Sequence, residues 1–127
     1  MPTVWVRYIV NDVDAAIGFY ERLGFKVDMH PAPGFAALSR GDLQLLLNAV
    51  GGGGGAAQPM PDGRRPEPGG WNRIQLRVKD LDREVSELKQ AGARFRNEIV
   101  NGNGGRQILL EDLSGNVIEL FERSSRE

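Results

Sequence analysis

The stretch Glu111–Glu122, with the sequence EDLSGNVIELFE, combines a tight turn with a short strand. The Asp, Ser and Asn side chains of the DLSGN segment can bond to their own backbone, and glycine adopts a positive φ easily, so the segment predicts a turn. Val117–Phe121 is rich in branched and aromatic residues, which is typical of a strand. Alternation along that strand puts Glu119 on the opposite face from Ile118 and Leu120. Because an unpaired buried carboxylate is costly, we expect Glu119 to have a partner or to face a polar cavity.

Composition predicts one globular domain spanning residues 1–127, since 40% of the residues are hydrophobic and 26% are charged. A formal net charge of −1 predicts neither a nucleic-acid nor a membrane surface. The absence of cysteine excludes disulfides, thiolate catalysis and Cys-based zinc sites. With no leader pattern and no apolar run long enough to span a bilayer, the expected location is cytoplasmic.

A strand–helix pattern occurs twice in the chain. The segment NDVD at 11–14 matches KDLD at 79–82, and the glycines that end the two predicted helices, Gly24 and Gly92, are also 68 positions apart. Alternating or branched runs predict strands at 4–10, 25–30, 35–39 and 43–48 in the first half, and at 73–78, 94–100, 107–110 and 117–121 in the second. Pro31 and Pro33 are expected to end the second strand, and Asn-Gly pairs at 101–104 predict a hairpin turn.

The predicted fold is α+β, with two tandem βαβββ modules at residues 3–49 and 72–123. In each module the helix would cover the outer face of a curved, mixed, four-stranded sheet, and the other face would line a cup. Residues 50–71 join the modules and contain the run Gly51–Gly55 and four prolines, which favours a connector. A lid that uses Arg64 and Arg65 to contact an anion is the alternative.

Strand alternation selects the residues that face the cup. Trp5 could stack on a planar ligand or simply fill the barrel, and the arginines could bind an anion. His30 could act as a base, but a position at the solvent-exposed end of a strand is favoured. Residues 101–106 match no phosphate-binding motif. The predicted ligand-binding residues are Trp5, Arg7, Gln44, Asn48, Arg73, Gln75, Arg77, Glu119 and Phe121.

Three motifs make the sequence similar to one known family. They are VNDV at 10–13 with FY at 19–20 and LGF at 23–25, the related VKDL at 78–81, and DLSGNVIEL at 112–120. Together they resemble the vicinal oxygen chelate superfamily, which groups glyoxalase I, bleomycin-resistance proteins and extradiol dioxygenases. The resemblance covers nearly the whole chain outside the linker and implies the fold, whereas one fold hosts many chemistries.

The resemblance also implies where a metal would bind. The family's ligand positions correspond here to Trp5, Gln44 (or Leu45, if Gly41 is matched to Gly115), Arg73 and Glu119. Only Glu119 matches the family's metal-binding pattern, and Trp5 and Arg73 cannot ligate, because an indole offers only an N–H and a guanidinium stays protonated. With one histidine in the chain, no site of two histidines and one carboxylate can form within it. We therefore predict no cofactor, with a divalent metal as the alternative, and we expect Arg73 to pair with Glu119, in a bidentate arrangement if the geometry allows.

Two functions follow from the resemblance. The first is a metal-independent protein of the bleomycin-resistance type, which holds an antibiotic or another planar or anionic metabolite in the crevice of a homodimer. The second is a lyase, isomerase or dioxygenase with atypical or no metal ligands, in which Glu119 would be the candidate catalytic base. A carboxylate held by an arginine is a weak base at neutral pH, which favours the binding protein.

Overall fold

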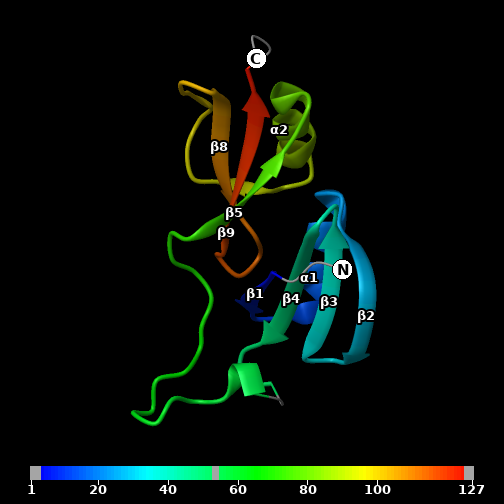
Figure 1. Cartoon of the computed structure of the whole chain (residues 1–127), viewed down its shortest axis with the longest axis vertical. Coiled ribbons are helices and arrows are strands. Elements are labelled where there is room, and N and C mark those ends of the chain that lie inside the picture. Colours follow the sequence, from blue (N-terminus) through cyan, green and yellow to red (C-terminus); the bar gives the residue numbers. More distant parts are fainter. Residues whose placement is uncertain (1–3, 53–54, 125–127) are drawn as a thin grey trace. The chain divides into compact units, whose positions relative to one another are not determined.

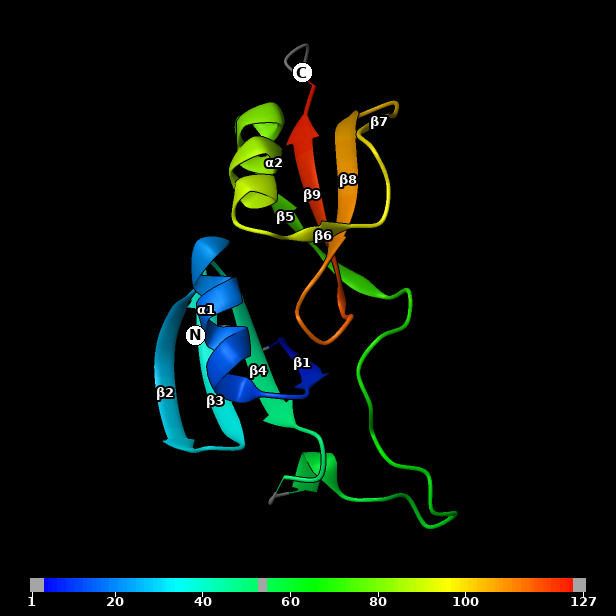
Figure 2. The ribbon, with the colours of Figure 1, turned by 180° about the vertical axis from the view of Figure 1, so that it is seen from behind.

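The computed structural model describes residues 4–52 and 55–124 of the chain. It divides into two compact units, Met1–Gly69 and Gly70–Glu127, so the division falls within the predicted linker. Each unit contains one βαβββ module, and in each a helix lies against one face of a mixed sheet (Figures 1 and 2). The predicted α+β class and the tandem modules are confirmed.

The first unit orders its strands β1-β4-β3-β2, with β1 parallel to β4 and the other pairs antiparallel. Its helix packs on the face that carries Leu45 and Leu47, both fully buried. A short 3-10 helix, η1, follows the last strand. The elements are β1 (Trp5–Val10), α1 (Val13–Arg22), β2 (Lys26–Ala32), β3 (Phe35–Arg40), β4 (Leu43–Ala49) and η1 (Gly55–Ala57).

Local chemistry fixes both ends of α1. The carboxylate of Asp12 accepts a hydrogen bond from the backbone N–H of Ala15, which caps the N-terminus. Gly24 follows the helix with a φ of 92°, a conformation that suits glycine, as predicted. Tyr20 is fully buried, and its ring makes T-shaped contacts with those of Phe19 and Phe25.

The expected end of the second strand at Pro31 is wrong, because β2 continues through Pro31 to Ala32. This strand lies at the edge of its sheet, and a proline is tolerated there because one side of an edge strand makes no ladder hydrogen bonds. The pairing with β3 is also irregular at two places, between Val27 and Met29 and between Met29 and Ala32.

The second unit forms a five-stranded sheet in the order β5-β9-β8-β6, with β5 parallel to β9, while β7 also pairs with β8. The single strand predicted at 94–100 is therefore wrong: β6 and β7 are two short pieces along the same partner. The side chain of Asn97 explains the break, because its Oδ1 accepts the N–H of Leu109 at 2.9 Å in place of a backbone carbonyl. The elements are β5 (Arg73–Arg77), α2 (Leu81–Gln90), β6 (Arg94–Phe95), β7 (Val100–Asn101), β8 (Gly105–Glu111) and β9 (Val117–Arg123).

The predicted turn between β8 and β9 is confirmed and is organised by Asp112, which is fully buried. One carboxylate oxygen accepts the backbone N–H groups of Ser114 and Asn116 at 2.8 and 2.9 Å. The other accepts the amide of Asn116 at 3.0 Å. Gly115 adopts a φ of 91°. Within the described residues, neither helix is long and apolar enough to cross a membrane.

Acid is expected to weaken the second unit through Glu122. Its Oε1 accepts the N–H of Leu81 at the start of α2 at 2.8 Å and a guanidinium N–H of Arg106 at 3.0 Å. The bond from Leu81, and then that from Arg106, hold the pKa of Glu122 below its ordinary value. A lowered folded-state pKa contributes stability above the ordinary value, and this stability is lost as the pH falls through the folded value.

The variant Glu122→Gln keeps the acceptor oxygen and removes the charge. We expect it to be less stable than the parent at neutral pH and equal to it at a pH below the folded pKa of Glu122, as measured by urea unfolding at a series of pH values. A stability difference that stayed constant into acid would contradict this role of the charge.

Candidate functional site

The face of the second sheet that points away from α2 carries Glu119, whose side chain is only 8% exposed. Its Oε1 accepts a hydrogen bond from Nε of Arg73 at 3.0 Å, and its Oε2 accepts one from Nε2 of Gln75 at 2.8 Å. The predicted Arg73–Glu119 pair is therefore confirmed. The pair does not take the bidentate form that the sequence left open, because Arg73 and Gln75 each occupy one carboxylate oxygen.

Strand pairing explains this arrangement. Gln75 of β5 lies directly beside Glu119 of β9 in the parallel register. Arg73 pairs with Val117, which is two residues before Glu119 and on the same face of the sheet. The short amide thus reaches its neighbour directly, and the longer guanidinium reaches across from the next position on the same face. The free-energy cost of burying the Glu119 carboxylate is offset by its charge-assisted hydrogen bond from Arg73 and by the second hydrogen bond from Gln75.

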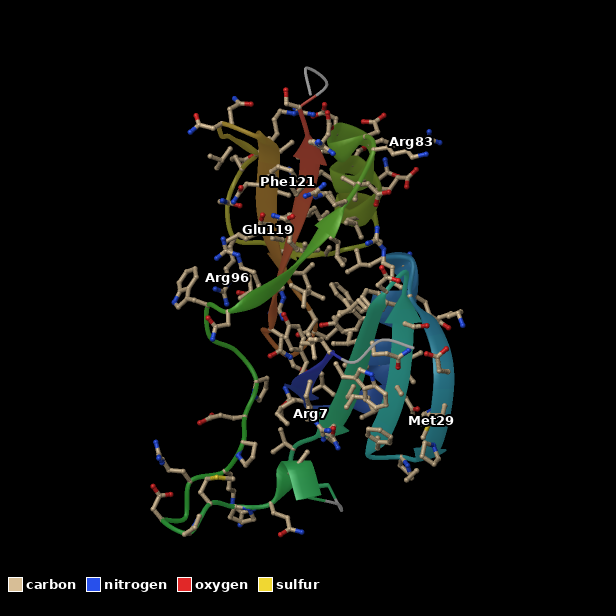
Figure 3. All side chains as sticks on the ribbon, in the orientation of Figure 1. Arg7, Met29, Arg83, Arg96, Glu119 and Phe121 are labelled. Atoms are coloured by element: carbon tan, nitrogen blue, oxygen red, sulfur yellow. The ribbon has the colours of Figure 1, made fainter. Side chains whose placement is uncertain are left out.

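Arg73, Gln75 and Glu119 form a row of polar side chains, and this row continues along β5 to Arg77. Its Nε lies 3.4 Å from Oε1 of Gln75, and its guanidinium carbon lies 5.4 Å from the ring centre of Phe121, within cation–π range. Gln75 thus accepts on one side and donates to Glu119 on the other, which fixes its amide. Glu119 and Phe121 follow one another along the same face of β9 (Figure 3).

A second arginine–aromatic pair lies at the start of β5, and we did not predict it. The guanidinium of Arg96 stands 4.4 Å from the ring centre of Trp71 and donates to Glu111 Oε2 at 2.8 Å. It also donates to the backbone oxygens of Gly70 and Gly115. Trp71 is 69% exposed. The available signal was the alternation WNRIQLR at 71–77, which extends the row of Arg73 and Gln75 back to this tryptophan.

The other predicted ligand-binding residues lie on the first sheet. Arg7 donates to Oδ1 of Asn48 at 3.1 Å, and Gln44 pairs with Trp5, which is 52% exposed. Arg7 pairs with Leu46, just as its repeat counterpart Gln75 pairs with Glu119. By strand pairing the position that corresponds to Glu119 therefore holds Leu46, whereas the motif comparison favoured Gln44. A ligand role for Trp5, Arg7, Gln44 and Asn48 stays a prediction.

One carboxylate of the first sheet was also not predicted as a site residue. Asp28 accepts hydrogen bonds from Nζ of Lys26 at 3.0 Å, from Oγ of Ser39 at 3.2 Å and from Nε2 of Gln44 at 3.2 Å. The bond from Lys26, followed by those from Ser39 and Gln44, holds the pKa of Asp28 below its ordinary value. Asp28 therefore stays ionised at neutral pH. An aspartate in an exposed edge strand gives no sequence signal of this role.

Two further candidates, His30 and Arg64, have structural contacts, and so does Arg106, which was not a candidate. Nε2 of His30 lies 3.5 Å from Asp14 of α1. Arg106 pairs with Asp82 and Glu122, and its pKa is raised first by the hydrogen bond to Asp82. In the linker, Arg64 pairs with Asp62 at 2.9 Å. These contacts assign no catalytic or anion-binding role to the three residues, and closure of the linker over a ligand stays a prediction.

The residues around Glu119 do not fit a divalent metal. Both carboxylate oxygens accept hydrogen bonds, and the nearest charged neighbour is a guanidinium, which cannot ligate and repels a cation. Within residues 4–52 and 55–124, no three side chains of His, Cys, Asp or Glu gather in a way that could hold a metal ion. We derive no chemistry through a metal at this site.

Comparison with known proteins places this architecture in one family. The family model for the Glyoxalase/Bleomycin resistance protein/Dioxygenase superfamily matches residues 3–120. A superfamily member from Sphaerobacter thermophilus is 26% identical with a TM-score of 0.73, and the match covers 97% of this chain and 98% of that one. The antibiotic-binding protein TnmS3 from Streptomyces sp. CB03234 is 25% identical with a TM-score of 0.71, covering 98% of each chain.

A lactoylglutathione lyase from Agrobacterium tumefaciens shares the fold at 18% identity, with a TM-score of 0.73 and coverage of 95% of this chain and 94% of that one. No curated protein matches the chain. The motifs quoted above, the two βαβββ modules and the match over residues 3–120 agree with one another. This chain therefore belongs to the Glyoxalase/Bleomycin resistance protein/Dioxygenase superfamily.

Proposed function

We propose that this protein binds a planar, anionic small molecule without a metal, on the face of the second sheet that carries Glu119. One observation carries the proposal. The carboxylate at the family's metal-binding position is held by Arg73 and Gln75, and the row that they form is flanked by an aromatic ring at each end, Trp71 and Phe121. A polar row between aromatic rings suits a flat ligand with a charged group.

The charge of this face supports an anion. By strand register it carries arginines at 73, 77, 94 and 123 and glutamates at 111 and 119, and the side chain of Arg96 pairs with Glu111. The side chain of Arg73 is 31% exposed, so its guanidinium can donate to a second partner in addition to Glu119. Arginine binds carboxylates and similar anions through two parallel N–H groups, which gives both affinity and orientation.

The state of Glu119 supports binding rather than catalysis. A general base must be free to accept a proton from the substrate, and both oxygens of this carboxylate already accept hydrogen bonds from Arg73 and Gln75. The similarity to an antibiotic-binding protein is consistent with a role in sequestering an antibiotic or another planar metabolite. A cytoplasmic location stays a prediction.

The direct test is a titration with planar aromatic carboxylates, followed by tryptophan fluorescence and by thermal shift. We expect saturable binding that Arg77→Gln and Phe121→Leu each weaken by about tenfold or more, the loss of one charge-assisted or stacking contact. Arg83→Gln is the matched control, because Arg83 projects from α2 away from Glu119 (Figure 3). Equal loss in all three variants would refute the site.

A metal titration separates this proposal from a metalloenzyme. We expect the protein, purified without chelator, to contain less than stoichiometric metal and to show no thermal shift with nickel, zinc, iron or manganese. Specific binding to the native state would stabilise it by an amount that grows with the logarithm of one plus the ligand concentration over Kd. Clear stabilisation by one ion that Glu119→Gln abolishes would favour the enzyme instead.

We also propose that the protein is a homodimer. Each sheet ends in edge strands, β1 and β2 in the first and β5 in the second, and open edges are commonly covered by another strand or chain. Light scattering at micromolar concentration is expected to give twice the mass of 14.0 kDa. A monomeric mass at that concentration would contradict the proposal.

A further inference from the structure

The hairpin that joins β7 to β8 contains two Asn-Gly sequences in succession, Asn101–Gly102 and Asn103–Gly104 (Figure 2). All four residues are exposed. In such a sequence the backbone nitrogen of the glycine can reach the side-chain carbonyl carbon of the asparagine, and no side chain on the glycine hinders the approach. Because the local chemistry of the two pairs is the same, a difference in their reactivity must come from the fold.

The fold protects the first pair. Asn101 belongs to β7 and pairs with Arg106 of β8. The backbone N–H of Gly102 donates to the carbonyl of Gly105 at 2.7 Å, so the nitrogen that would attack Asn101 is already engaged. A reaction at Asn101 therefore requires the hairpin to open locally and this bond to break.

The second pair lies at the tip of the hairpin, between the two strands. The carbonyl of Gly104 accepts the N–H of Ser124 at 2.8 Å, which holds the tip against the end of β9. Its N–H has no such constraint: within residues 4–52 and 55–124, no acceptor lies within hydrogen-bond range of the Gly104 nitrogen. Attack on the Asn103 side chain breaks no hydrogen bond of the nitrogen.

We propose that Asn103 is a site of spontaneous deamidation, which proceeds in the folded protein ahead of any reaction at Asn101. After losing its proton, the Gly104 nitrogen bonds to Cγ of Asn103, the Cγ–Nδ2 bond breaks, and ammonia leaves. Water then opens the resulting succinimide ring. Cleavage between the ring nitrogen and Cγ gives aspartate, and cleavage between that nitrogen and the backbone carbonyl carbon gives isoaspartate. Water is the only co-reactant.

The reaction does not rest on the proposed function, because it uses only the hairpin tip. Both products add a carboxylate at position 103, and isoaspartate also adds a methylene to the backbone of the turn. A Cβ built on Gly104 would lie 3.8 Å from the ring of Phe121, so the modified backbone lies beside that ring.

The experiment ages the purified full-length protein at physiological temperature and mildly alkaline pH, with samples digested by trypsin in mild acid. Cleavage after Arg96 and Arg106 releases residues 97–106 as one peptide, in which fragment masses compare both sites directly. We expect Asn103 to react about tenfold faster than Asn101, since the latter must first break a backbone hydrogen bond. An isoaspartyl methyltransferase with a labelled methyl donor measures the isoaspartate.

The same protein aged in urea is the control for the fold. Without the hairpin, the two Asn-Gly pairs are expected to react at similar rates. A preference for Asn103 that persisted in urea would assign the difference to the local sequence and would overturn the inference.

Two glycine variants test the attacking nitrogen. Gly104→Ala is expected to slow the reaction at Asn103 severalfold, because the new methyl group hinders its own backbone nitrogen. Gly102→Ala is the matched control and should leave the rate at Asn103 unchanged. The added methyl groups would lie 3.8 Å from Phe121 and 3.6 Å from the carbonyl of Gly105, which are ordinary contacts. Thermal melting checks that both variants fold.

Three further outcomes overturn the inference. They are no deamidation of Asn103 in the folded protein, equal rates at Asn101 and Asn103 in the folded protein, and equal slowing of Asn103 by Gly104→Ala and Gly102→Ala.

Discussion

Replacing Tyr20 by alanine is expected to lower the free energy of unfolding by about 3–5 kcal/mol, the range for removing a large buried aromatic side chain. Tyr20 is fully buried on the inner face of α1, with its ring 5.1 Å from that of Phe19 and 5.5 Å from that of Phe25, both edge-on. The alanine would leave a cavity and remove both aromatic contacts. Urea unfolding, with the m-value compared between variant and parent, measures the effect.

Tyr20→Phe is the matched control, since it keeps the ring and removes only the hydroxyl. Its expected cost is about 0.5–1.5 kcal/mol, the usual net contribution of one hydrogen bond. A loss below about 1 kcal/mol for Tyr20→Ala would show that the helix does not depend on this packing, or that the site collapses around the alanine.

The second large effect is expected for Arg73→Ala, which leaves Glu119 buried without its charged partner. Breaking a fully buried ion pair costs about 3–5 kcal/mol, and the 31% exposure of the arginine reduces the expected loss here to about 2–3 kcal/mol. Gln75 still donates to the carboxylate but carries no charge. Chemical denaturation at neutral pH measures the loss.

A double variant separates the cost of the orphaned carboxylate from the value of the pair. Arg73→Met combined with Glu119→Leu should recover most of the stability, because apolar replacement of a buried ion pair is often neutral. Arg83→Ala is the surface control: Arg83 pairs with Glu87 in solvent, and its loss should stay within about 0.5 kcal/mol. If Arg73→Ala lowered the free energy of unfolding no more than Arg83→Ala does, the Arg73–Glu119 pair would not contribute to stability.

Much of the fold could be predicted from local patterns. Both helices begin within the repeated segments NDVD and KDLD, where Asp12 and Asp80 cap them, and the predicted glycines follow with positive φ at 24 and 92. Alternation predicted which side of β9 carries Glu119, and the repeat predicted that Arg73 lies on the same side. The split between β6 and β7 escaped prediction, because it depends on one side chain, Asn97, that competes with the backbone for a hydrogen bond.

The candidate site, like the fold, could be predicted only in part. The sequence by itself determined the family, the two modules, the shortage of metal ligands and the pairing of Arg73 with Glu119. Only the tertiary structure decided that Gln75 takes the second oxygen, that Arg96 supports Trp71, and that Ser39 and Gln44 hold Asp28. The physical reason is that caps, turns and strand faces follow from residues a few positions apart and from the repeat, whereas the individual atoms that meet on a sheet face depend on strand register and side-chain reach.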